Sequence, residues 1–340
     1  MLRLPDFNYL KPKSLKEAVK VLADLGPDAM VVAGGTDVYP KMKRGQFTPR
    51  HLVSLRTLRE LKGIRRGQEG IWLGAGETLT AVSGHPLISK RFPALSHAAE
   101  SVSTPQLRNM GTIGGNVLVD TRCNYYDQTF FWRQAVGFCM KKDGDVCWVA
   151  PGSDKCLAIS SSDTAPVFLS LDAEAVLLGS LGERRVKLAE LYRDDGINYL
   201  GKRSDEVLRG VVIPPQALGW RNVYLKLRRR GSFDFPVLGV AAALDLTGGE
   251  CRLARIALTA VSSAPKLVPE ASRLLEGGKV TAEMIEAAAD AASRAAHPLD
   301  NADLDYWYRK RMAKVYVQRA LEQLAGLQSE RERVNQGAKF

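Results

Sequence analysis

Four cysteines that lie close together in the sequence are the residues best suited to chemistry. Cys123, Cys139, Cys147 and Cys156 follow the spacing C-x15-C-x7-C-x8-C, whereas Cys251 stands alone in an apolar stretch. In a reducing compartment, clustered thiols are typical of a metal or catalytic site rather than of disulfides. The spacing matches neither paired zinc knuckles nor a bacterial ferredoxin pattern. Zinc, an iron–sulfur cluster and four unrelated buried cysteines therefore stay open here, and Cys251 is expected in a core.

Two glycine turns form the second group of residues with chemical potential. Residues 33–37 read Ala-Gly-Gly-Thr-Asp after a short buried-strand pattern, and residues 111–116 read Gly-Thr-Ile-Gly-Gly-Asn. A strand followed by a glycine turn leaves backbone N–H groups free and can cradle an anion. Two such turns could hold one pyrophosphate from both sides, although a single turn could equally be a tight bend. Neither matches the Rossmann glycine pattern.

The elements that must position these residues follow from periodicity and turn signals. A capping box from Ser14 to Glu17 begins a helix that ends at Gly26. Pro214-Pro215 marks a domain boundary. Further expected strands lie at 51–55, 71–74, 173–178, 186–191, 207–213, 222–227, 237–246 and 253–261, and further expected helices lie at 93–103, 264–275, 281–296 and 304–324.

Residues 120–162 interrupt this periodic pattern and contain all four clustered cysteines. A segment of this length is too long for a structureless loop in a compact domain unless something organises it. A metal centre would supply that order, because the binding energy of such a site is also folding energy. Cys123 lies seven residues after Asn116, and Cys156 lies seven residues before Asp163. Seven residues span at most ~25 Å, so the first cysteine is tethered to Asn116 and the last to Asp163.

Composition and charge exclude several classes of protein. The chain has 340 residues, of which 45% are hydrophobic and 25% charged, and its net charge is +11. These values are typical of a globular protein that favours acidic partners. The basic residues are scattered apart from Arg228–Arg230, and no nucleic-acid motif is present, so a zinc-stabilised nucleic-acid-binding protein is the weaker alternative. No signal-peptide pattern or membrane-length apolar run occurs, and we expect a cytoplasmic protein without membrane or nucleic-acid partners.

The order of four motifs resembles a known family. The two glycine turns are followed by Ser162-Asp163 before an apolar segment and by Lys226 early in a C-terminal sheet. This set resembles the FAD-binding medium subunit of the xanthine dehydrogenase family of molybdenum enzymes. The resemblance implies an α+β fold with an FAD-binding domain of two α/β subdomains at 1–216. It also implies a three-stranded antiparallel sheet with a helical bundle at 217–328, and residues 329–340 are expected to form a tail.

The resemblance also implies which residues contact FAD. Asp163 would hydrogen-bond the flavin nucleotide, and Lys226, Leu208 and Val102 would flank it. The residues implied around the pyrophosphate are those of the two turns, namely Val32, Ala33, Gly34, Gly35, Thr36, Asp37, Gly111, Thr112, Ile113, Gly114, Gly115 and Asn116.

The cysteine segment, an insertion at about 120–160, narrows the resemblance. It is similar to the β subunits of the 4-hydroxybenzoyl-CoA reductase branch of the family. That similarity implies a 4Fe–4S cluster held by Cys123, Cys139, Cys147 and Cys156, with ferredoxin as the electron donor. It implies a large molybdopterin subunit and a small subunit with 2Fe–2S clusters, in a heterotrimer that dimerises. The alternative is a related hydroxylase subunit that passes electrons outward to an external acceptor.

No acid–base pair for substrate chemistry is evident in the sequence. His51, His85, His97 and His297 are far apart and have no serine or cysteine partner at triad spacing. We therefore expect no catalytic residue in this chain. That pattern favours an electron-transfer subunit in a larger complex, whose substrate reacts on another subunit.

Overall fold

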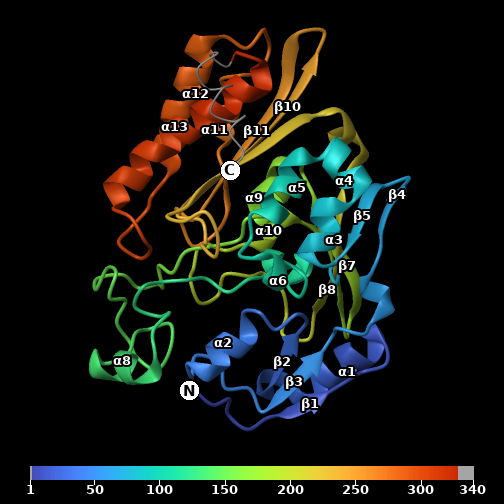
Figure 1. The fold of residues 1–340 in the computed structure, drawn as a ribbon, viewed down its shortest axis with the longest axis vertical. Coiled ribbons are helices and arrows are strands. Elements are labelled where there is room, and N and C mark those ends of the chain that lie inside the picture. The colour runs from blue at the N-terminus through green and yellow to red at the C-terminus, as the bar shows by residue number, and fades with distance from the viewer. Residues whose placement is uncertain (1, 328–340) are drawn as a thin grey trace.

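The computed structural model describes residues 2–327, which form three sheet-containing layers and one irregular segment at their side (Figure 1). The expected tail at 329–340 lies outside the described residues. The N-terminal sheet (blue) forms the lower layer, a larger sheet with its helices forms the middle layer, and the C-terminal sheet and helices form the upper layer. The irregular segment (green) lies beside the lower layer.

The lower layer is a small parallel sheet with a helix that begins at the expected capping box. Its strands are β1 (Asn8–Leu10), β2 (Ala29–Val32) and β3 (His51–Ser54), in the order β1-β3-β2. Helix α1 (Leu15–Leu25) begins after Ser14, whose hydroxyl accepts the Glu17 N–H at 3.1 Å. The Glu17 carboxylate accepts the Lys13 N–H at 2.7 Å, and these two bonds satisfy N–H groups that a helix start leaves free.

The middle layer is a five-stranded antiparallel sheet covered by short helices. The strand order is β4-β5-β8-β6-β7, and the residues that form its core include Ile71, Phe168 and Val211, all without exposed surface. The elements of this layer are β4 (Ile64–Gly67), β5 (Gly70–Gly74), α3 (Leu79–Gly84), α4 (Pro86–Arg91), α5 (Pro93–Glu100), α6 (Pro105–Arg108), α7 (Ile113–Val117), α9 (Ala165–Ser170), β6 (Glu174–Gly179), β7 (Gly182–Lys187), α10 (Leu188–Leu191) and β8 (Val207–Ile213).

The upper layer packs helices against one face of an antiparallel sheet. Alternate residues of its long strands, such as Val240 and Ala242, pack against helix residues such as Ala288 and Val317. Three long strands form the sheet as expected, and a two-residue strand extends its edge. The elements are β9 (Arg221–Leu227), β10 (Leu238–Thr247), β11 (Glu250–Thr259), β12 (Lys266–Leu267), α11 (Pro269–Arg273), α12 (Ala282–Ala295) and α13 (Tyr306–Ala325).

The remaining elements are short. Helix α2 (Val38–Lys43) follows the first glycine turn, and α8 (Phe130–Ala135) is the single α-helix in the irregular segment. Three-residue and five-residue 3-10 helices occur at η1 (Gly26–Asp28), η2 (Arg59–Leu61) and η3 (Pro215–Gly219). Helix α9 is buried throughout and contacts the upper sheet, so the middle and upper layers share a core.

The α+β fold class is confirmed, and two expected elements are wrong. The strand expected at 186–191 ends at Lys187, because Leu188 and Leu191 are both buried at helical spacing and form α10. The helix expected at 264–275 begins only at Pro269, since Lys266 and Leu267 pair with β11 as β12. Among residues 2–327, no helix is both long enough and apolar enough to cross a membrane.

Candidate functional site

The first glycine turn presents a row of unused backbone donors. It connects β2 to α2, and Gly35 adopts the left-handed φ of +73° that glycine accepts without strain. Within residues 2–327, the N–H groups of Gly34, Gly35, Thr36 and Asp37 donate to no acceptor. Consecutive free N–H groups around a left-handed residue form a concave nest that binds anions. This turn therefore suits a phosphate group.

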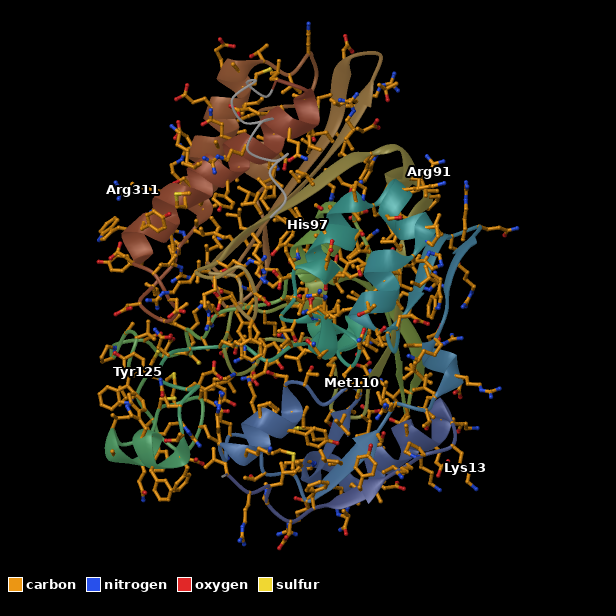
Figure 2. The ribbon with its side chains drawn as sticks, viewed as in Figure 1. Lys13, Arg91, His97, Met110, Tyr125 and Arg311 are labelled. Atoms are coloured by element: carbon orange, nitrogen blue, oxygen red, sulfur yellow. The ribbon has the colours of Figure 1, made fainter. Side chains whose placement is uncertain are left out.

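The second glycine turn lies directly against the first. A Cβ atom at Gly34 would lie 1.9 Å from the carbonyl oxygen of Met110, so only glycine allows this approach. Met110 lies where the lower and middle layers meet (Figure 2). A Cβ atom at Gly111 would lie 3.5 Å from the Thr36 hydroxyl oxygen. The structure thus brings together the two motifs that the sequence separates by more than seventy residues.

Most N–H groups of the second turn are already used inside the protein. Ile113 donates to the Glu77 carbonyl at 2.8 Å, Gly114 to the Ala75 carbonyl at 2.9 Å, and Gly115 to the Thr112 hydroxyl at 3.1 Å. Gly114 also has no room for a side chain, because a Cβ atom would lie 2.7 Å from the Ala75 side chain. The two turns therefore differ: the first offers free donors, and the second supplies close packing beside them.

Asn116 connects the second turn to the Ser-Asp motif. Its side-chain oxygen accepts hydrogen bonds from the Ser162 hydroxyl at 2.9 Å and from the Thr164 hydroxyl at 2.7 Å. The hydroxyl of Ser161, which is buried, has no partner among the described residues. A buried hydroxyl without a partner is costly, so Ser161 is an additional candidate contact for a bound nucleotide. Ser161 is not among the residues predicted from the sequence.

Asp163 lies fully buried at the junction of the middle and upper layers. It accepts hydrogen bonds from the Tyr224 hydroxyl at 2.7 Å and from the Lys226 ammonium at 3.0 Å, and Lys226 also donates to the Ser101 carbonyl at 3.0 Å. Burial raises the pKa of Asp163 and lowers that of Lys226, although each charge favours ionisation of the other. Tyr224 was missed by the sequence analysis, although it precedes Lys226 by two residues on β9 and so shares its face.

The other expected flavin residues lie around these turns. Val32 ends β2, and Ala33 begins the first turn. Leu208 lies on β8 inside the apolar core of the middle layer, and Val102 packs against that core. Their roles as flavin contacts stay predictions.

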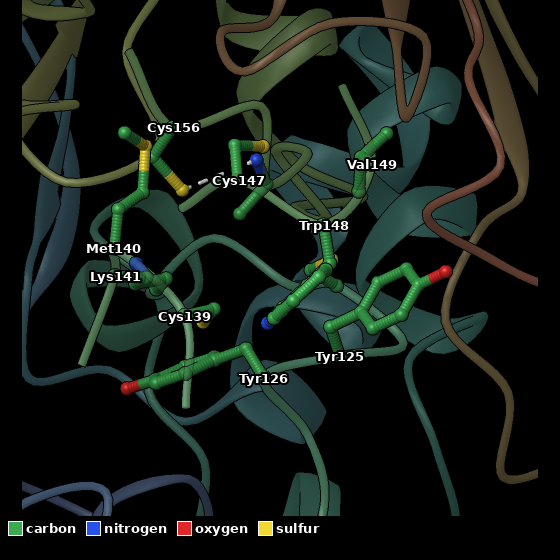
Figure 3. Close-up of a pocket in the computed structure, with 11 residues that line it drawn as sticks. Tyr125, Tyr126, Cys139, Met140, Lys141, Cys147, Trp148, Val149 and Cys156 are labelled. Carbon is green, nitrogen blue, oxygen red and sulfur yellow. Dashed lines mark hydrogen bonds between the residues drawn. The ribbon is translucent and has the colours of Figure 1, made fainter. Parts of the chain in front are cut away.

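The four clustered cysteines line one cavity. Cys123, Cys139, Cys147 and Cys156 are each between 4% and 8% exposed, and Tyr125, Tyr126, Met140, Lys141, Trp148, Val149 and Ala158 complete the walls (Figure 3). All four are free thiols. The structure brings the four cysteines to one cavity, which favours a shared site over four unrelated buried cysteines. A set of four buried sulfurs suits a soft metal or an iron–sulfur cluster.

The cavity keeps at least two of its thiols neutral in the absence of a cation. Burial raises the pKa of Cys123 to about 12 and that of Cys156 to about 11. The Cys156 sulfur accepts one weak hydrogen bond, from the Ala158 N–H at 3.5 Å. Among residues 2–327, no three His, Cys, Asp or Glu side chains are grouped closely enough to hold a single metal ion. The sulfurs line the same space without meeting at one point.

The base of the cysteine segment is tied to the first glycine turn. Arg122 and Ile159 exchange backbone hydrogen bonds of 2.8 and 2.7 Å, which close the segment at its neck. The Arg122 guanidinium donates to the Asp37 carboxylate at 2.5 Å and stacks on Phe235 at 3.6 Å from the ring centre. Asp37 is the last residue of the first turn. This side-chain contact is additional to the tether expected from the sequence, which runs along the chain to Asn116 and Asp163.

Comparison with known families places this arrangement in a class. A model of the FAD-binding domain in molybdopterin dehydrogenases matches residues 5–216, and a model of the C-terminal domain of CO dehydrogenase flavoproteins matches residues 222–324. The chain belongs to this family of FAD-binding subunits of molybdenum enzymes. The expected FAD binding and the role as an oxidoreductase electron-transfer subunit are confirmed at this level.

Individual relatives agree with this assignment. The carbon monoxide dehydrogenase medium chain of Hydrogenophaga pseudoflava is 31% identical over 318 residues, covering 93% of this chain and 96% of the relative. The nicotinate dehydrogenase FAD-subunit of Eubacterium barkeri is 27% identical over 289 residues, covering 84% of each chain.

Solved structures show the same fold over nearly the whole chain. The cyanide-inactivated Cu,Mo-CO dehydrogenase matches with a TM-score of 0.79 and 28% identity, covering 95% of this chain and 99% of that chain. Quinoline 2-oxidoreductase from Pseudomonas putida 86 matches with a TM-score of 0.74 and 26% identity, covering 95% and 98%.

Proposed function

We propose that the chain is the electron-transfer subunit of a molybdenum enzyme of the 4-hydroxybenzoyl-CoA reductase type. In this proposal, reduced ferredoxin would supply electrons through a 4Fe–4S centre and FAD to partner subunits, where 4-hydroxybenzoyl-CoA, two electrons and two protons would give benzoyl-CoA and water. The observation that carries this proposal is the convergence of four cysteines on one cavity whose neck contacts the first glycine turn. This arrangement supports electron exchange between the two proposed redox groups.

The residues of this chain have separate roles in the proposal. The first turn holds the FAD pyrophosphate through its free N–H groups, and the second turn packs beside it. Asp163, positioned by Tyr224 and Lys226, contacts the flavin nucleotide. Cys123, Cys139, Cys147 and Cys156 hold the cluster. When bound, FAD supplies both one-electron and two-electron exchange, which lets it connect a one-electron centre to the substrate reaction.

The proposal extends to organisation and partners. Residues 1–216 form the FAD-binding domain and residues 217–328 the C-terminal domain, with the cluster-binding insertion at about 120–160. The partners are a large molybdopterin subunit and a small 2Fe–2S subunit in a heterotrimer that dimerises in the cytoplasm. The medium-chain and FAD-subunit names of the relatives support a role within a complex. The net charge of +11 favours an acidic donor such as ferredoxin.

A second candidate is an FAD subunit that passes electrons outward to an external acceptor. The names of the relatives favour it, because several are dehydrogenases. Purification of the native complex, followed by two assays, separates the candidates. We expect reduced ferredoxin to drive 4-hydroxybenzoyl-CoA-dependent turnover with release of benzoyl-CoA. Turnover only in the oxidative direction, with an artificial acceptor and no reaction of the thioester, would favour the second candidate.

A further inference from the structure

A buried chain of charges joins the cysteine cavity to the helix that follows the first glycine turn. Lys41 on α2 and Lys141 on the cavity wall both contact Asp120, Lys141 at 2.8 Å. All three side chains are buried: Lys41 is 1% exposed, Lys141 6% and Asp120 8%. None of the three is among the site residues predicted from the sequence. Burying a group of charged side chains costs desolvation energy and does not by itself stabilise a fold. This cost is a reason to look for a functional role.

The positive charges of the two lysines are neutralised to different extents by nearby carboxylates. Lys41 has a second carboxylate nearby, since Asp37 lies 3.8 Å away. Within residues 2–327, Lys141 has Asp120 as its one carboxylate partner and shares it with Lys41. Its other acceptors are neutral, namely the Thr121 hydroxyl at 2.7 Å and the Gly196 carbonyl at 2.5 Å. Lys141 therefore carries positive charge that its surroundings only partly neutralise.

This partly compensated charge lies at the cysteines. Lys141 lines the same cavity as the four sulfurs, on the side of Met140 and Cys139 (Figure 3). The ring of Tyr126, another wall residue, lies 4.9 Å from the Lys141 nitrogen and 5.1 Å from the Lys41 nitrogen. Tyr126 is thus in cation–π contact with both lysines.

The two lysines keep Asp120 ionised in spite of its burial. Burial opposes its charge, but the two lysines outweigh burial and hold the pKa of Asp120 below its ordinary value. Asp120 therefore remains an anion that fixes both ammonium groups. Removal of either lysine leaves Asp120 with the other, so the loss of Lys141 exposes no unpaired buried charge.

We propose that Lys141 is a positioning residue that sets the charge environment of the cysteine centre, and that Asp120 moderates its effect. This inference rests on the proposed function, because it needs a redox-active group on the four sulfurs. Reduction adds one electron, and hence one negative charge, to such a group. A fixed cation on the cavity wall stabilises the added charge and raises the reduction potential.

The test is an anaerobic redox titration of the full chain, with dithionite as the electron source and the visible and electron paramagnetic resonance spectra as readouts. Lys141→Met should keep iron and flavin while its iron centre becomes harder to reduce. We expect the equilibrium constant for that reduction to fall about tenfold, which for one electron is a shift of about 59 mV to a more negative potential. Lys142→Met is the matched control, because Lys142 is paired with Asp143 and does not line the cavity.

Asp120→Asn is the second variant, and it should shift the reduction potential in the opposite direction. It leaves both lysines and removes the shared anion, so the potential of the iron centre should become less negative. If Lys141 and Asp120 had only a structural role, the two substitutions would shift the reduction potential in the same direction or leave it unchanged. Either result would overturn the inference. Failure of the proposed function is distinguishable, because the unsubstituted chain would then contain no iron. Loss of iron in Lys141→Met alone would also overturn the inference, since charge-setting requires an intact centre.

Discussion

The first glycine turn and the cysteine segment achieve order by different means. The turn lies between a strand and a helix, and its function rests on backbone N–H groups that a local conformation leaves free. The cysteine segment, residues 120–162, has one short helix. Side chains hold it in place: the Arg122–Asp37 pair, the Lys41–Asp120–Lys141 set and the four buried sulfurs. A backbone-built site depends on glycine, whereas a side-chain-built site depends on its charges and its bound group.

The largest expected effect tests the backbone-built site. Gly34→Ala places a Cβ atom 1.9 Å from the Met110 carbonyl oxygen and forces the two turns apart. We expect FAD affinity to fall by at least about tenfold, which corresponds to about 1.4 kcal/mol. Flavin released from the purified chain is the measurement. Gly67→Ala is the control, because a Cβ atom there meets no neighbour within 4 Å. Normal flavin content in Gly34→Ala would contradict the cradle.

The next effect separates the two sites. Cys139→Ser removes one of four sulfurs from the cavity, so iron should be lost while FAD stays bound at its own site. Iron and flavin are measured on the same sample. Cys251→Ser is the matched control, since Cys251 is equally buried but lies in the core of the upper layer. Equal loss of FAD in Cys139→Ser would mean that the segment is needed to build the flavin site.

The contact between the two regions can be weakened directly. Arg122→Gln removes the bond to Asp37 and the stacking on Phe235, and we expect the free energy of unfolding to fall by about 1–2 kcal/mol. Arg50→Gln breaks an exposed pair with Asp28, for which less than about 0.5 kcal/mol is expected. Urea denaturation of both variants tests the difference. Equal effects would show that the neck contact is no stronger than a surface ion pair.

The smallest effect concerns the buried hydroxyl beside Asp163. Tyr224→Phe removes its 2.7 Å hydrogen bond but leaves Lys226 in place, so we expect a loss of about 1 kcal/mol in the free energy of unfolding. Tyr308→Phe, at a half-exposed side chain on α13, is the control and should change little. A flavin absorption spectrum of Tyr224→Phe that is shifted while binding persists would support contact between Asp163 and the nucleotide.

Local sequence motifs predicted the helices, strands and turns. They could not predict contacts between residues that lie far apart in the sequence. The helix after Ser14 followed from its capping box, and the turn at Gly34 followed from a strand that ends in glycines. The sequence favoured a metal or catalytic site at the four cysteines, but their spacing alone left the metal open. It could not indicate Lys141, because Asp120, Gly196 and Tyr126 come to it from distant positions and only the folded chain brings them together.

The strand expected at 186–191 shows that local sequence can also mislead about secondary structure. A run of apolar and polar residues fitted a strand, yet Leu188 and Leu191 turn into the core as a helical turn because neighbouring layers cover them. Tyr224 could have been found, since residues two apart on a strand share a face with Lys226. Ser161 gave no local signal at all, and only its burial without a partner identifies it.

One measurement tests the central claim most directly: the iron and flavin content of the anaerobically purified full chain, read together with its visible spectrum. We expect one FAD and about four iron atoms per chain, with flavin bands on a broad iron–sulfur absorption. One FAD with zinc and no iron would contradict the iron–sulfur centre, and with it the proposed electron path through the cysteine cavity.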